Sequence, residues 1–241
     1  MAGAVSFPVR QAVVVAGGLG TRLGELTAET PKPLLSVGGR PFLEWVIANL
    51  EAQGVEEVIL TVGYRAEAFE AWRSRAPIGI GLRVFAEEEP LGTGGALPRL
   101  AEWLDPTFLV LNGDTLFDAP LRALAALRAE ASAAGALALR AVADGARYGE
   151  VRLDGSVVRA FAEKGPTGPG LINGGVYVFA REVVERIPSP GSIERDLLPA
   201  LAAEGSLVGL PSDGFFIDIG VPETFEDAQT SVARWWKESR G

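Results

Sequence analysis

Short apolar runs alternate with amphipathic segments through the first half of the chain. The runs are rich in β-branched residues and are the length of buried strands, at residues 12–15, 58–62, 82–85 and 108–111. The segments between them carry apolar residues at helical spacing, at residues 41–54, 66–75 and 96–103. Strands and helices in alternation predict a parallel sheet with helices packed on its faces.

The pattern changes beyond Asp118. Helices are expected at 120–127, at 193–203 and from Pro222 onward, and short strands at 137–142, 151–153, 157–161, 176–179 and 215–217. Asp154-Gly155 is a strong turn signal and predicts a hairpin between two of these strands. We therefore expect antiparallel strands to extend the sheet. The alanine-rich run at 123–138 is most simply an ordinary helix.

These elements predict an α/β fold with a single Rossmann-like domain over residues 1–241. The central sheet should be mixed and mostly parallel, flanked by helices, with an antiparallel extension. A chain of 241 residues that is 48% hydrophobic can bury one sizeable core, and a second full domain would be cramped. Phe225, Trp235 and Trp236 of the last helix are expected to pack on this core rather than bind a ligand.

Composition narrows the chemistry. The net charge of -9 and the pI near 4.7 argue against nucleic acid or an anionic membrane as the main partner. The chain has no His and no Cys, which removes histidine triads, histidine-ligated zinc and disulfides, and leaves carboxylates, Lys and Arg. The first ten residues lack a signal-peptide pattern, and no apolar run reaches the roughly eighteen residues that cross a bilayer. We expect a cytoplasmic protein.

A glycine-rich loop follows the first strand. Gly17, Gly18 and Gly20 lack side chains that would keep backbone N–H groups away from an anion. Arg22 adds a permanent charge, and Lys32 sits between two prolines that stiffen the backbone. The loop is therefore a candidate phosphate site, although a plain tight turn would also explain the glycines.

Two common phosphate-binding motifs do not fit this loop. A Walker loop needs Gly-Lys followed by Ser or Thr, which is absent here. A dinucleotide-binding loop needs a third glycine where this chain has Leu23, and an acid at the end of the second strand, where residues 61–64 read TVGY. The segments GGLGTRL and PKP instead resemble the signature of the sugar-1-phosphate nucleotidyltransferases. The resemblance runs from about residue 11 to residue 227.

This resemblance implies an NTP-transferase fold of the GT-A-like type. The part of the chain from about residue 10 to residue 118 would bind a nucleoside triphosphate. The part from about residue 119 to residue 241 would bind a sugar 1-phosphate. The nucleotide would contact the glycine-rich loop at Ala16, Gly17, Gly18, Gly20 and Thr21. Arg22 would stabilise charge on the leaving pyrophosphate, and Lys32 would contact the phosphates at the reacting centre.

A second glycine-rich segment reads EEPLGTGG at residues 88–95, after a predicted strand end where ligands collect in open sheets. By resemblance this loop reads the base in the manner of guanylyltransferases, through Glu88, Glu89, Gly92 and Thr93. A carboxylate can accept from both guanine N1–H and N2–H, which uracil and thymine cannot match. A solvated acidic turn is the alternative for either glutamate.

Two aspartates follow predicted strands, Asp114 after the segment LNG and Asp218 within FFID. Mg²⁺ typically takes one or two protein carboxylates together with phosphate oxygens and water, which two strand-end aspartates suit. Aspartates are also common turn formers. Both positions match the family's metal-binding aspartates, so the resemblance implies a Mg²⁺ site. Asn112 and Gly113, which directly precede Asp114, are expected to contact the sugar.

The pair Glu163-Lys164 follows the predicted hairpin. By resemblance, Lys164 holds the sugar phosphate and Glu163 takes sugar hydroxyls, while Asn173 and Gly174 of the segment INGGVY line the sugar. Gly165 stands where many relatives have proline. From the residues alone, Glu163 and Lys164 could also form an exposed pair without a function.

The implied reaction transfers a nucleotidyl group, with GTP favoured, to a sugar 1-phosphate and releases pyrophosphate. The attacking phosphate oxygen is already an anion, so the absence of His is no obstacle. The motifs look closest to D-glycero-D-manno-heptose 1-phosphate guanylyltransferases. Mannose-1-phosphate guanylyltransferases and muramate- or glucose-1-phosphate uridylyl- or thymidylyltransferases stay open as alternatives. A monomer or small homo-oligomer is expected.

Two other classes of protein remain to be weighed. A non-catalytic nucleotide-sugar sensor would keep the fold and the glycine loops, but it would not need Arg22, Lys32, Asp114, Asp218 and Lys164 together. A nicotinamide-dependent oxidoreductase is disfavoured by the missing third glycine and the missing ribose-binding acid.

Overall fold

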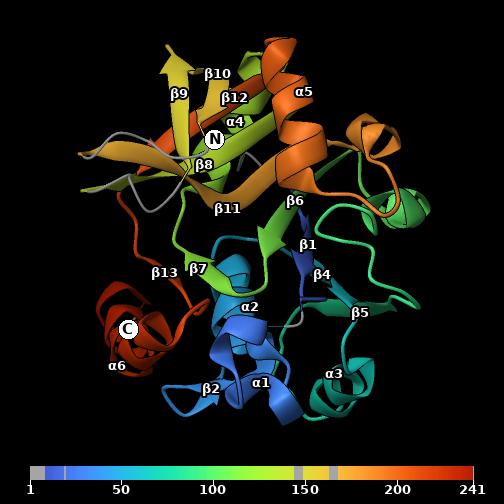
Figure 1. Ribbon diagram of the computed structural model, residues 1–241, viewed down its shortest axis with the longest axis vertical. Coiled ribbons are helices and arrows are strands. Elements are labelled where there is room, and N and C mark those ends of the chain that lie inside the picture. The colour runs from blue at the N-terminus through green and yellow to red at the C-terminus, as the bar shows by residue number, and fades with distance from the viewer. Residues whose placement is uncertain (1–8, 19, 144–148, 163–167, 241) are drawn as a thin grey trace, which may run out of the picture.

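The computed structural model describes residues 9–18, 20–143, 149–162 and 168–240. Within these ranges the chain forms a nine-stranded sheet in the order β5-β4-β1-β6-β11-β8-β12-β10-β9 (Figure 1). The first four strands run parallel: β5 (Gly81–Ala86), β4 (Glu57–Val62), β1 (Gln11–Val15) and β6 (Thr107–Asn112). The others are β11 (Gly170–Ala180), β8 (Gly135–Val142), β12 (Leu207–Ser212), β10 (Val157–Ala162) and β9 (Glu150–Asp154). Antiparallel pairing begins at β11, so the predicted mixed sheet with an antiparallel extension is confirmed.

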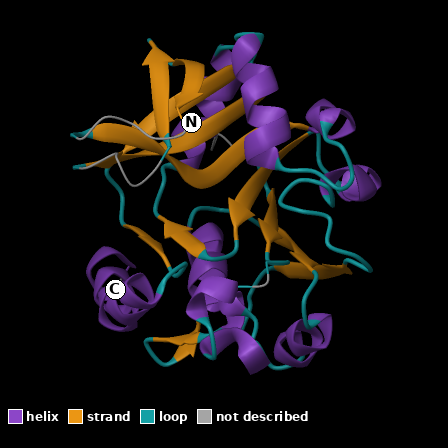
Figure 2. Cartoon of the chain, in the orientation of Figure 1, coloured by secondary structure: helices purple, strands orange, loops and turns teal. Residues whose placement is uncertain are grey.

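Helices pack on both faces of this sheet (Figure 2). The α-helices are α1 (Leu26–Glu29), α2 (Phe42–Ala52), α3 (Ala66–Arg73), α4 (Leu121–Glu130), α5 (Leu198–Ala203) and α6 (Pro222–Arg240). The 3₁₀ helices are η1 (Thr21–Leu23), η2 (Lys32–Leu34), η3 (Leu97–Trp103) and η5 (Arg181–Arg186), and η6 (Ile193–Leu197) is a π-helix. No helix in the described ranges has the length and apolar character needed to span a membrane.

Two small antiparallel ribbons complete the fold. One pairs β2 (Ser36–Val37) with β3 (Arg40–Pro41), and the other pairs β7 (Thr115–Phe117) with β13 (Phe216–Asp218). The second ribbon lies beside α6 in Figure 1. There Trp235 stacks on Phe215 with ring centroids 4.8 Å apart, so this aromatic residue of the last helix packs on the domain, as the sequence predicted.

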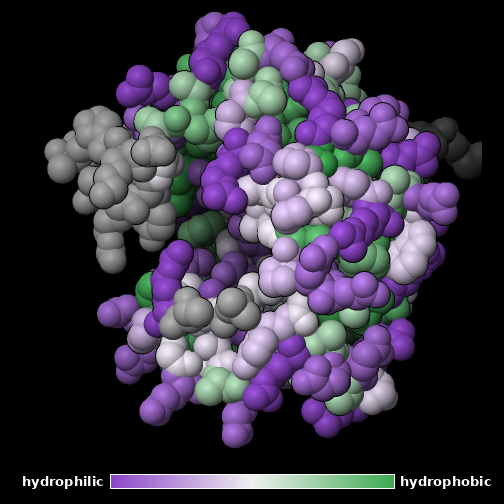
Figure 3. All heavy atoms as spheres, turned by 45° about the vertical axis from the view of Figure 1, so that its right-hand side comes forward, coloured by the Kyte–Doolittle hydropathy of each residue, from purple (hydrophilic) through white to green (hydrophobic). Residues whose placement is uncertain are grey.

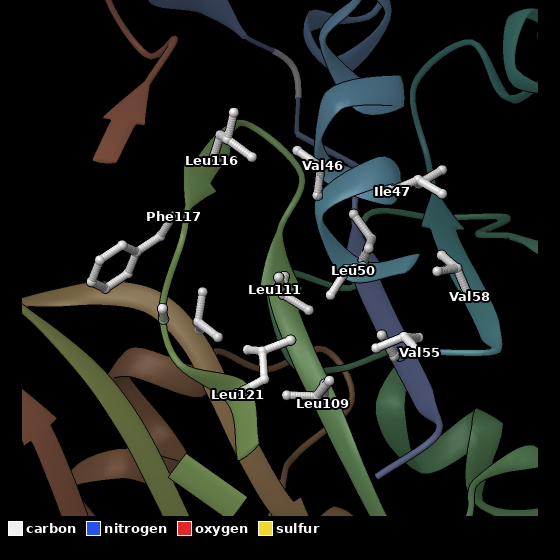
Figure 4. Close-up of a cluster of buried hydrophobic side chains, with 14 of the residues drawn as sticks. Val46, Ile47, Leu50, Val55, Val58, Leu109, Leu111, Leu116, Phe117 and Leu121 are labelled. Carbon is white, nitrogen blue, oxygen red and sulfur yellow. The ribbon is translucent and has the colours of Figure 1, made fainter. Parts of the chain in front are cut away.

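Strand residues alternate between two hydrophobic clusters, one on each face of the sheet. On β1, Ala12 and Val14 belong to the first cluster and Val13 to the second. Helices α2, α3, α4 and α6 cover the first cluster, and α5, η3 and η5 cover the second. Figure 4 shows Leu50 of α2 among side chains of the first cluster that include Leu111 of β6. Because both faces are buried along β1, β4 and β6, these strands read as largely apolar runs.

The helix predicted at 96–103 is a 3₁₀ helix. Its first backbone hydrogen bonds, Leu97 N–H to Gly94 O and Arg99 N–H to Ala96 O, are 3.0 Å long and each spans three residues. Pro98 has no N–H to donate and therefore cannot contribute a bond to the α-helical pattern.

The alanine-rich run at 123–138 is not one helix, which corrects the prediction. α4 ends at Glu130, Ser132 has a φ of 49°, and β8 begins at Gly135. β8 pairs with β11 on one side and β12 on the other. Pairing on both sides of β8 overrides the helix propensity of alanine.

The hairpin turn lies one residue later than predicted. Asp154 pairs with Val157, so Gly155, with a φ of 58°, and Ser156 form the turn. The sequence pattern also missed β12, because Gly209 and Pro211 interrupt its apolar residues. Even so, β12 runs parallel to β8 from Leu207 to Ser212.

The sheet brings two loops that carry candidate site residues to the carboxyl ends of its parallel strands. β1 and β6 are neighbours with Val15 opposite Asn112, so the segments that follow both strands leave the sheet together. Gly113 N–H donates to Val15 O at 2.8 Å, and a Cβ on Gly113 would lie 2.8 Å from that oxygen, which only glycine avoids. The β7–β13 ribbon then sets Asp218 opposite Thr115, just after the β6 loop.

Replacing Leu60 by Ala should lower the free energy of unfolding by about 2–5 kcal/mol, because Leu60 is fully buried and truncation leaves a cavity in the first cluster. Leu26→Ala is the matched control, since Leu26 is 47% exposed and should change stability little. Urea denaturation of both variants measures the difference. Equal losses would contradict the described core.

Candidate active site

Three cavities form one cleft at the carboxyl ends of β1 and β6. The central cavity, about 180 Å³, is lined by Val15, Ala16, Gly18, Lys32, Pro33, Thr93, Asn112 and Asp114. The acidic cavity, about 320 Å³, is lined by Gly20, Arg22, Lys32, Asp114, Thr115, Ile172, Asn173, Phe216, Asp218 and Gly220. The Glu87 cavity, about 230 Å³, is lined by Val15, Gly17, Gly18, Glu87, Pro90, Gly92 and Thr93. The cavities share lining residues and are therefore adjacent, and Figure 3 shows a hollow between the upper and lower halves of the molecule.

An ion pair separates the central and acidic cavities. Lys32 Nζ lies 2.9 Å from Asp114 Oδ2, although the two residues are 82 positions apart in the chain. The side chain of Lys32 is only 15% exposed and that of Asp114 is 35% exposed, so water screens the pair incompletely. Ile219 N–H donates to the backbone oxygen of Asp114 at 2.9 Å, which ties this strand end to the segment that carries Asp218.

Asp114 and Asp218 both line the acidic cavity. Gly220 N–H donates to Asp218 Oδ1 at 2.9 Å, and Thr115 Oγ1 donates to Asp114 Oδ1 at 3.3 Å. Each carboxylate retains acceptor capacity for a further partner. In the part of the chain that the structure describes, no group of three or more carboxylate, His or Cys side chains gathers to hold a metal. The donors fit a hard divalent cation that takes its remaining ligands from phosphate and water.

The glycine-rich loop borders the whole cleft. Gly17 and Gly18 lie at the Glu87 cavity, Ala16 at the central cavity, and Gly20 with Arg22 at the acidic cavity. Gly20 has a φ of 64°, and Thr27 Oγ1 donates to its carbonyl at 3.1 Å, which fixes the loop. Thr21 begins η1 directly after it. Backbone N–H groups and a cation are thus available along one wall, as anion binding requires.

The carboxylate that lines the third cavity is Glu87. It is the first residue after β5, where its N–H donates to Val62 O at 2.7 Å. Its Oε2 accepts from Leu91 N–H at 3.0 Å, whereas its buried Oε1 has no partner among the described residues. A Cβ on Gly17 would lie 3.3 Å from Oε1, so the carboxylate adjoins the glycine-rich loop. Sequence reasoning missed Glu87, although its place at a strand end was an available signal.

Burial raises the pKa of the Glu87 carboxyl above its ordinary value. The hydrogen bond from Leu91 N–H and the charge of Arg99 act in the opposite direction but do not cancel it. A half-buried acid with one unpartnered oxygen is costly for the fold and is typical of a ligand site.

Glu88 and Glu89, which were expected to read the base, are both exposed and line none of the three cavities. Glu89 Oε1 instead lies 3.5 Å from Arg99 Nη2 in a surface ion pair. Gly92 and Thr93, in contrast, line the Glu87 cavity.

The residues that the sequence predicts to contact the sugar divide into three groups. Asn112 lines the central cavity and Asn173 the acidic cavity. Gly113 contributes a backbone bond to Val15, and Gly174 packs against the ring of Phe117, so neither lines a cavity here. Glu163 and Lys164 lie outside the described residues. The acidic cavity also contains Ile172, which belongs to the predicted segment INGGVY, and it contains Thr115, Phe216 and Gly220, to which the sequence assigned no role.

The Glu87→Gln variant should gain stability relative to the wild type as the pH rises. Because burial raises the pKa of Glu87, the unfolded chain loses its proton first, and the free energy of unfolding falls from the ordinary glutamate pKa up through the folded pKa. Glutamine carries no such penalty and keeps the acceptor for Leu91 N–H. Urea titrations at about pH 4 and about pH 7 measure the free energy of unfolding of the variant and of the wild type, and the difference between the two proteins should change with pH. Exposed Glu88→Gln is the control, and an unchanged difference for Glu87→Gln would contradict the burial effect.

Known proteins match this chain over most of its length. The nucleotidyl transferase family matches residues 11–234. A D-glycero-alpha-D-manno-heptose 1-phosphate guanylyltransferase from Aneurinibacillus thermoaerophilus is 36% identical, covering 93% of this chain and 99% of the relative. A mannose-1-phosphate guanylyltransferase from Mycobacterium tuberculosis is 38% identical, covering 92% of this chain but 64% of the relative.

A solved structure agrees in fold and in sequence. HddC from Yersinia pseudotuberculosis, complexed with GMP-PN, superposes with a TM-score of 0.80 at 32% identity, covering 92% of this chain and 98% of that chain. The cleft geometry, the matched family and the shared fold agree, and the chain belongs to the nucleotidyl transferase family.

Proposed function

We propose that this protein transfers a guanylyl group from GTP to D-glycero-D-manno-heptose 1-phosphate and releases pyrophosphate. The observation that carries the proposal is the single cleft in which the glycine-rich loop, Lys32 and the pair Asp114 and Asp218 meet. Relatives of nearly the same length act on this heptose phosphate, according to their names.

The reaction is an in-line displacement at the α-phosphorus of the nucleotide. A phosphate oxygen of the sugar 1-phosphate forms the new P–O bond as the bond to pyrophosphate breaks. No proton is removed from the nucleophile, so catalysis rests on positioning two anions and balancing their charge. Arg22 stabilises charge on the pyrophosphate, Lys32 contacts the phosphates, and Lys164 holds the sugar phosphate.

Asp114 and Asp218 would hold the metal. Enzymes of this family use a divalent cation, and we assign Mg²⁺ because the site offers two carboxylates and open volume for phosphate oxygens and water. Bound there, Mg²⁺ supplies charge neutralisation for the phosphates. Lys32 Nζ donates to one oxygen of Asp114 in this structure, so Lys32 and a bound cation would share that carboxylate.

Glu87 accounts for the proposed preference for guanine. The Glu87 side chain lines a cavity that it shares with the glycine-rich loop, where the base of a bound nucleotide would lie, and its buried Oε1 has no partner among the described residues. Guanine offers N1–H and N2–H as paired donors to a carboxylate, whereas uracil and thymine present one ring N–H flanked by carbonyl acceptors. A buried acceptor that faces a carbonyl stays unpaired, which costs about 1–3 kcal/mol.

Mannose 1-phosphate is the second candidate sugar. The mannose-specific relative is as similar in sequence, but this chain spans only 64% of it, compared with 99% of the heptose-specific relative. The expected sugar-side residues Asn112, Gly113, Asn173 and Gly174, together with Glu163, would contact hydroxyls that both sugars share. Discrimination therefore depends on the additional carbon of the heptose.

A pyrophosphate-release assay tests the proposal with GTP, ATP, UTP and dTTP against heptose 1-phosphate and mannose 1-phosphate. We expect the highest kcat/KM for GTP with the heptose phosphate, and GTP should exceed UTP by about ten- to a hundredfold. Glu87→Gln should narrow that ratio, because an amide can donate to a pyrimidine carbonyl.

Glu88→Gln and Glu89→Gln serve as controls, since both residues are exposed outside the cleft and should leave the GTP to UTP ratio unchanged. Equal use of GTP and UTP by the wild type would contradict the guanine assignment. Binding of nucleotide without any turnover across the panel would instead favour the sensor class.

A further inference from the structure

The segment that follows the glycine-rich loop carries Arg22 and Lys32, which both line the acidic cavity. This segment, residues 20–32, is called the basic loop below. It leaves the cleft after Arg22 and returns to it at Lys32. A Cβ on Gly20 would lie 3.4 Å from Cε of Lys32, so the two ends of the basic loop are in contact. The position of Lys32 therefore depends on the path of the residues between these ends.

The basic loop has little regular structure to fix that path. Its helix α1 is four residues long, and a helix this short is marginal in water without contacts from outside. Thr27 is buried and donates through Oγ1 to Gly20 O and to Gly24 O, each at 3.1 Å, which fastens the first half of the loop. The last carbonyls of a helix have no partner within it, so those of α1 need donors from another segment.

The turn after β4 supplies these donors beside α1 (Figure 1). The hydroxyl of Tyr64 donates to Ala28 O at 3.1 Å. Arg65 Nη1 donates to Glu29 O at 2.9 Å, and Arg65 Nε donates to the Tyr64 hydroxyl at 3.1 Å, so the two side chains support each other. Tyr64 and Arg65 are called the clasp below. They hold the chain three residues before Lys32.

The backbone of this turn carries a strained residue. Arg65 has a φ of 55° and a ψ of 49°, a left-handed conformation that is unfavourable for most residues with a side chain. Such residues persist where the surrounding structure holds them, and they cluster at functional sites. The preceding residue, Gly63, packs on the glycine-rich loop, where a Cβ on Gly63 would lie 3.3 Å from Gly17 O. The turn therefore contacts both the glycine-rich loop and the basic loop.

The clasp lies outside the core and outside the cleft. Tyr64 and Arg65 are partly exposed, and their acceptor residues Ala28 and Glu29 are exposed. Neither side chain of the clasp lines any of the three cavities. Hydrogen bonds that water can replace contribute little to the stability of the whole fold. The contacts of the clasp therefore set the local path of the basic loop.

We propose that Tyr64 and Arg65 are positioning residues that hold the basic loop so that Lys32 is in place for the reacting phosphates. They act through the carbonyls of Ala28 and Glu29 and touch neither substrate. A loop that is ordered in advance does not have to be ordered when the nucleotide binds, which lowers the cost of reaching the reactive geometry. This inference rests on the proposed function, which places the phosphates beside Lys32.

Kinetics of single and double variants test whether the clasp acts through Lys32. Arg65→Asn removes the guanidinium and introduces a residue that tolerates the left-handed conformation. We expect kcat/KM to fall about tenfold in Arg65→Asn, and by less in Tyr64→Phe, which deletes only the hydroxyl. Lys32→Ala should cause the largest loss. Adding Arg65→Asn to Lys32→Ala should cause no further loss, because Lys32 is already absent.

Arg73→Gln is the matched control. Arg73 is an exposed arginine at the other end of α3, and it pairs with Glu70 of the same helix rather than with the basic loop. This variant should keep the kcat/KM of the wild type. The thermal midpoints of Arg65→Asn and Arg73→Gln should both lie within about 3 °C of the wild-type value, because neither change reaches the core.

Limited proteolysis measures the order of the basic loop without any substrate. Trypsin can cut after Arg22 but not after Lys32, because proline follows Lys32. Cleavage after Arg22, followed by mass spectrometry, should be about fivefold faster in Arg65→Asn than in the wild type. Arg73→Gln should be cut at the wild-type rate.

The kinetic assays use whichever nucleotide and sugar 1-phosphate the wild type converts best. An unchanged kcat/KM in Arg65→Asn would overturn the positioning role, and so would a double variant about tenfold less active than Lys32→Ala. Equal rates of cleavage after Arg22 in Arg65→Asn and in the wild type would also overturn it. No turnover with any pair of substrates would overturn the proposed function, and the cleavage rates would still decide whether the clasp orders the loop.

Discussion

The pairing register of β1 with β6 is the constraint on which the site depends. Val15 lies opposite Asn112, and the bond from Gly113 N–H to Val15 O closes the two strand ends against each other. The glycine-rich loop and Asp114 therefore begin within a few residues of the same point. A slip of one residue would turn Asp114 to the opposite face of the sheet and separate it from Lys32. The ion pair between Lys32 and Asp114 is a direct consequence of this register.

The cleft contains positively charged side chains although the protein as a whole is negatively charged. The chain carries a net charge of -9, yet its proposed reactants are both polyanions. Arg22 and Lys32 supply positive charge on one wall, and the two aspartates suit a cation that would complete the balance. Glu87 is held nearby with a raised pKa and an unpartnered oxygen. Such features cost stability and are expected where a site serves ligand binding rather than folding.

Much of the fold could be predicted from the sequence, because the apolar runs of β1, β4 and β6 are buried on both faces and leave a clear signal. The predictions that failed concern residues whose structure is decided by distant partners. β12 contains Gly209 and Pro211 and forms because β8 offers it a partner, and the second half of the alanine-rich run becomes β8 for the same reason.

Part of the candidate site could also be predicted from the sequence. Loop motifs indicated Lys32, Asp114, Asn173 and Asp218, and all four line the cleft. Among three consecutive glutamates, however, only the direction of the backbone after β5 decides that Glu87 faces inward and Glu88 outward. The hydrogen bond from Thr93 Oγ1 to Glu194 Oε2 joins residues 101 positions apart and therefore leaves no local pattern in the sequence.

Calorimetric titration with a non-reactive GTP analogue, with and without Mg²⁺, tests the central claim that Asp114 and Asp218 hold a cation against the nucleotide phosphates. We expect Mg²⁺ to tighten binding of the analogue to the wild type by at least about tenfold. This tightening should disappear in Asp114→Asn and in Asp218→Asn, while binding without metal persists. The same dependence on Mg²⁺ in either variant as in the wild type would contradict the account.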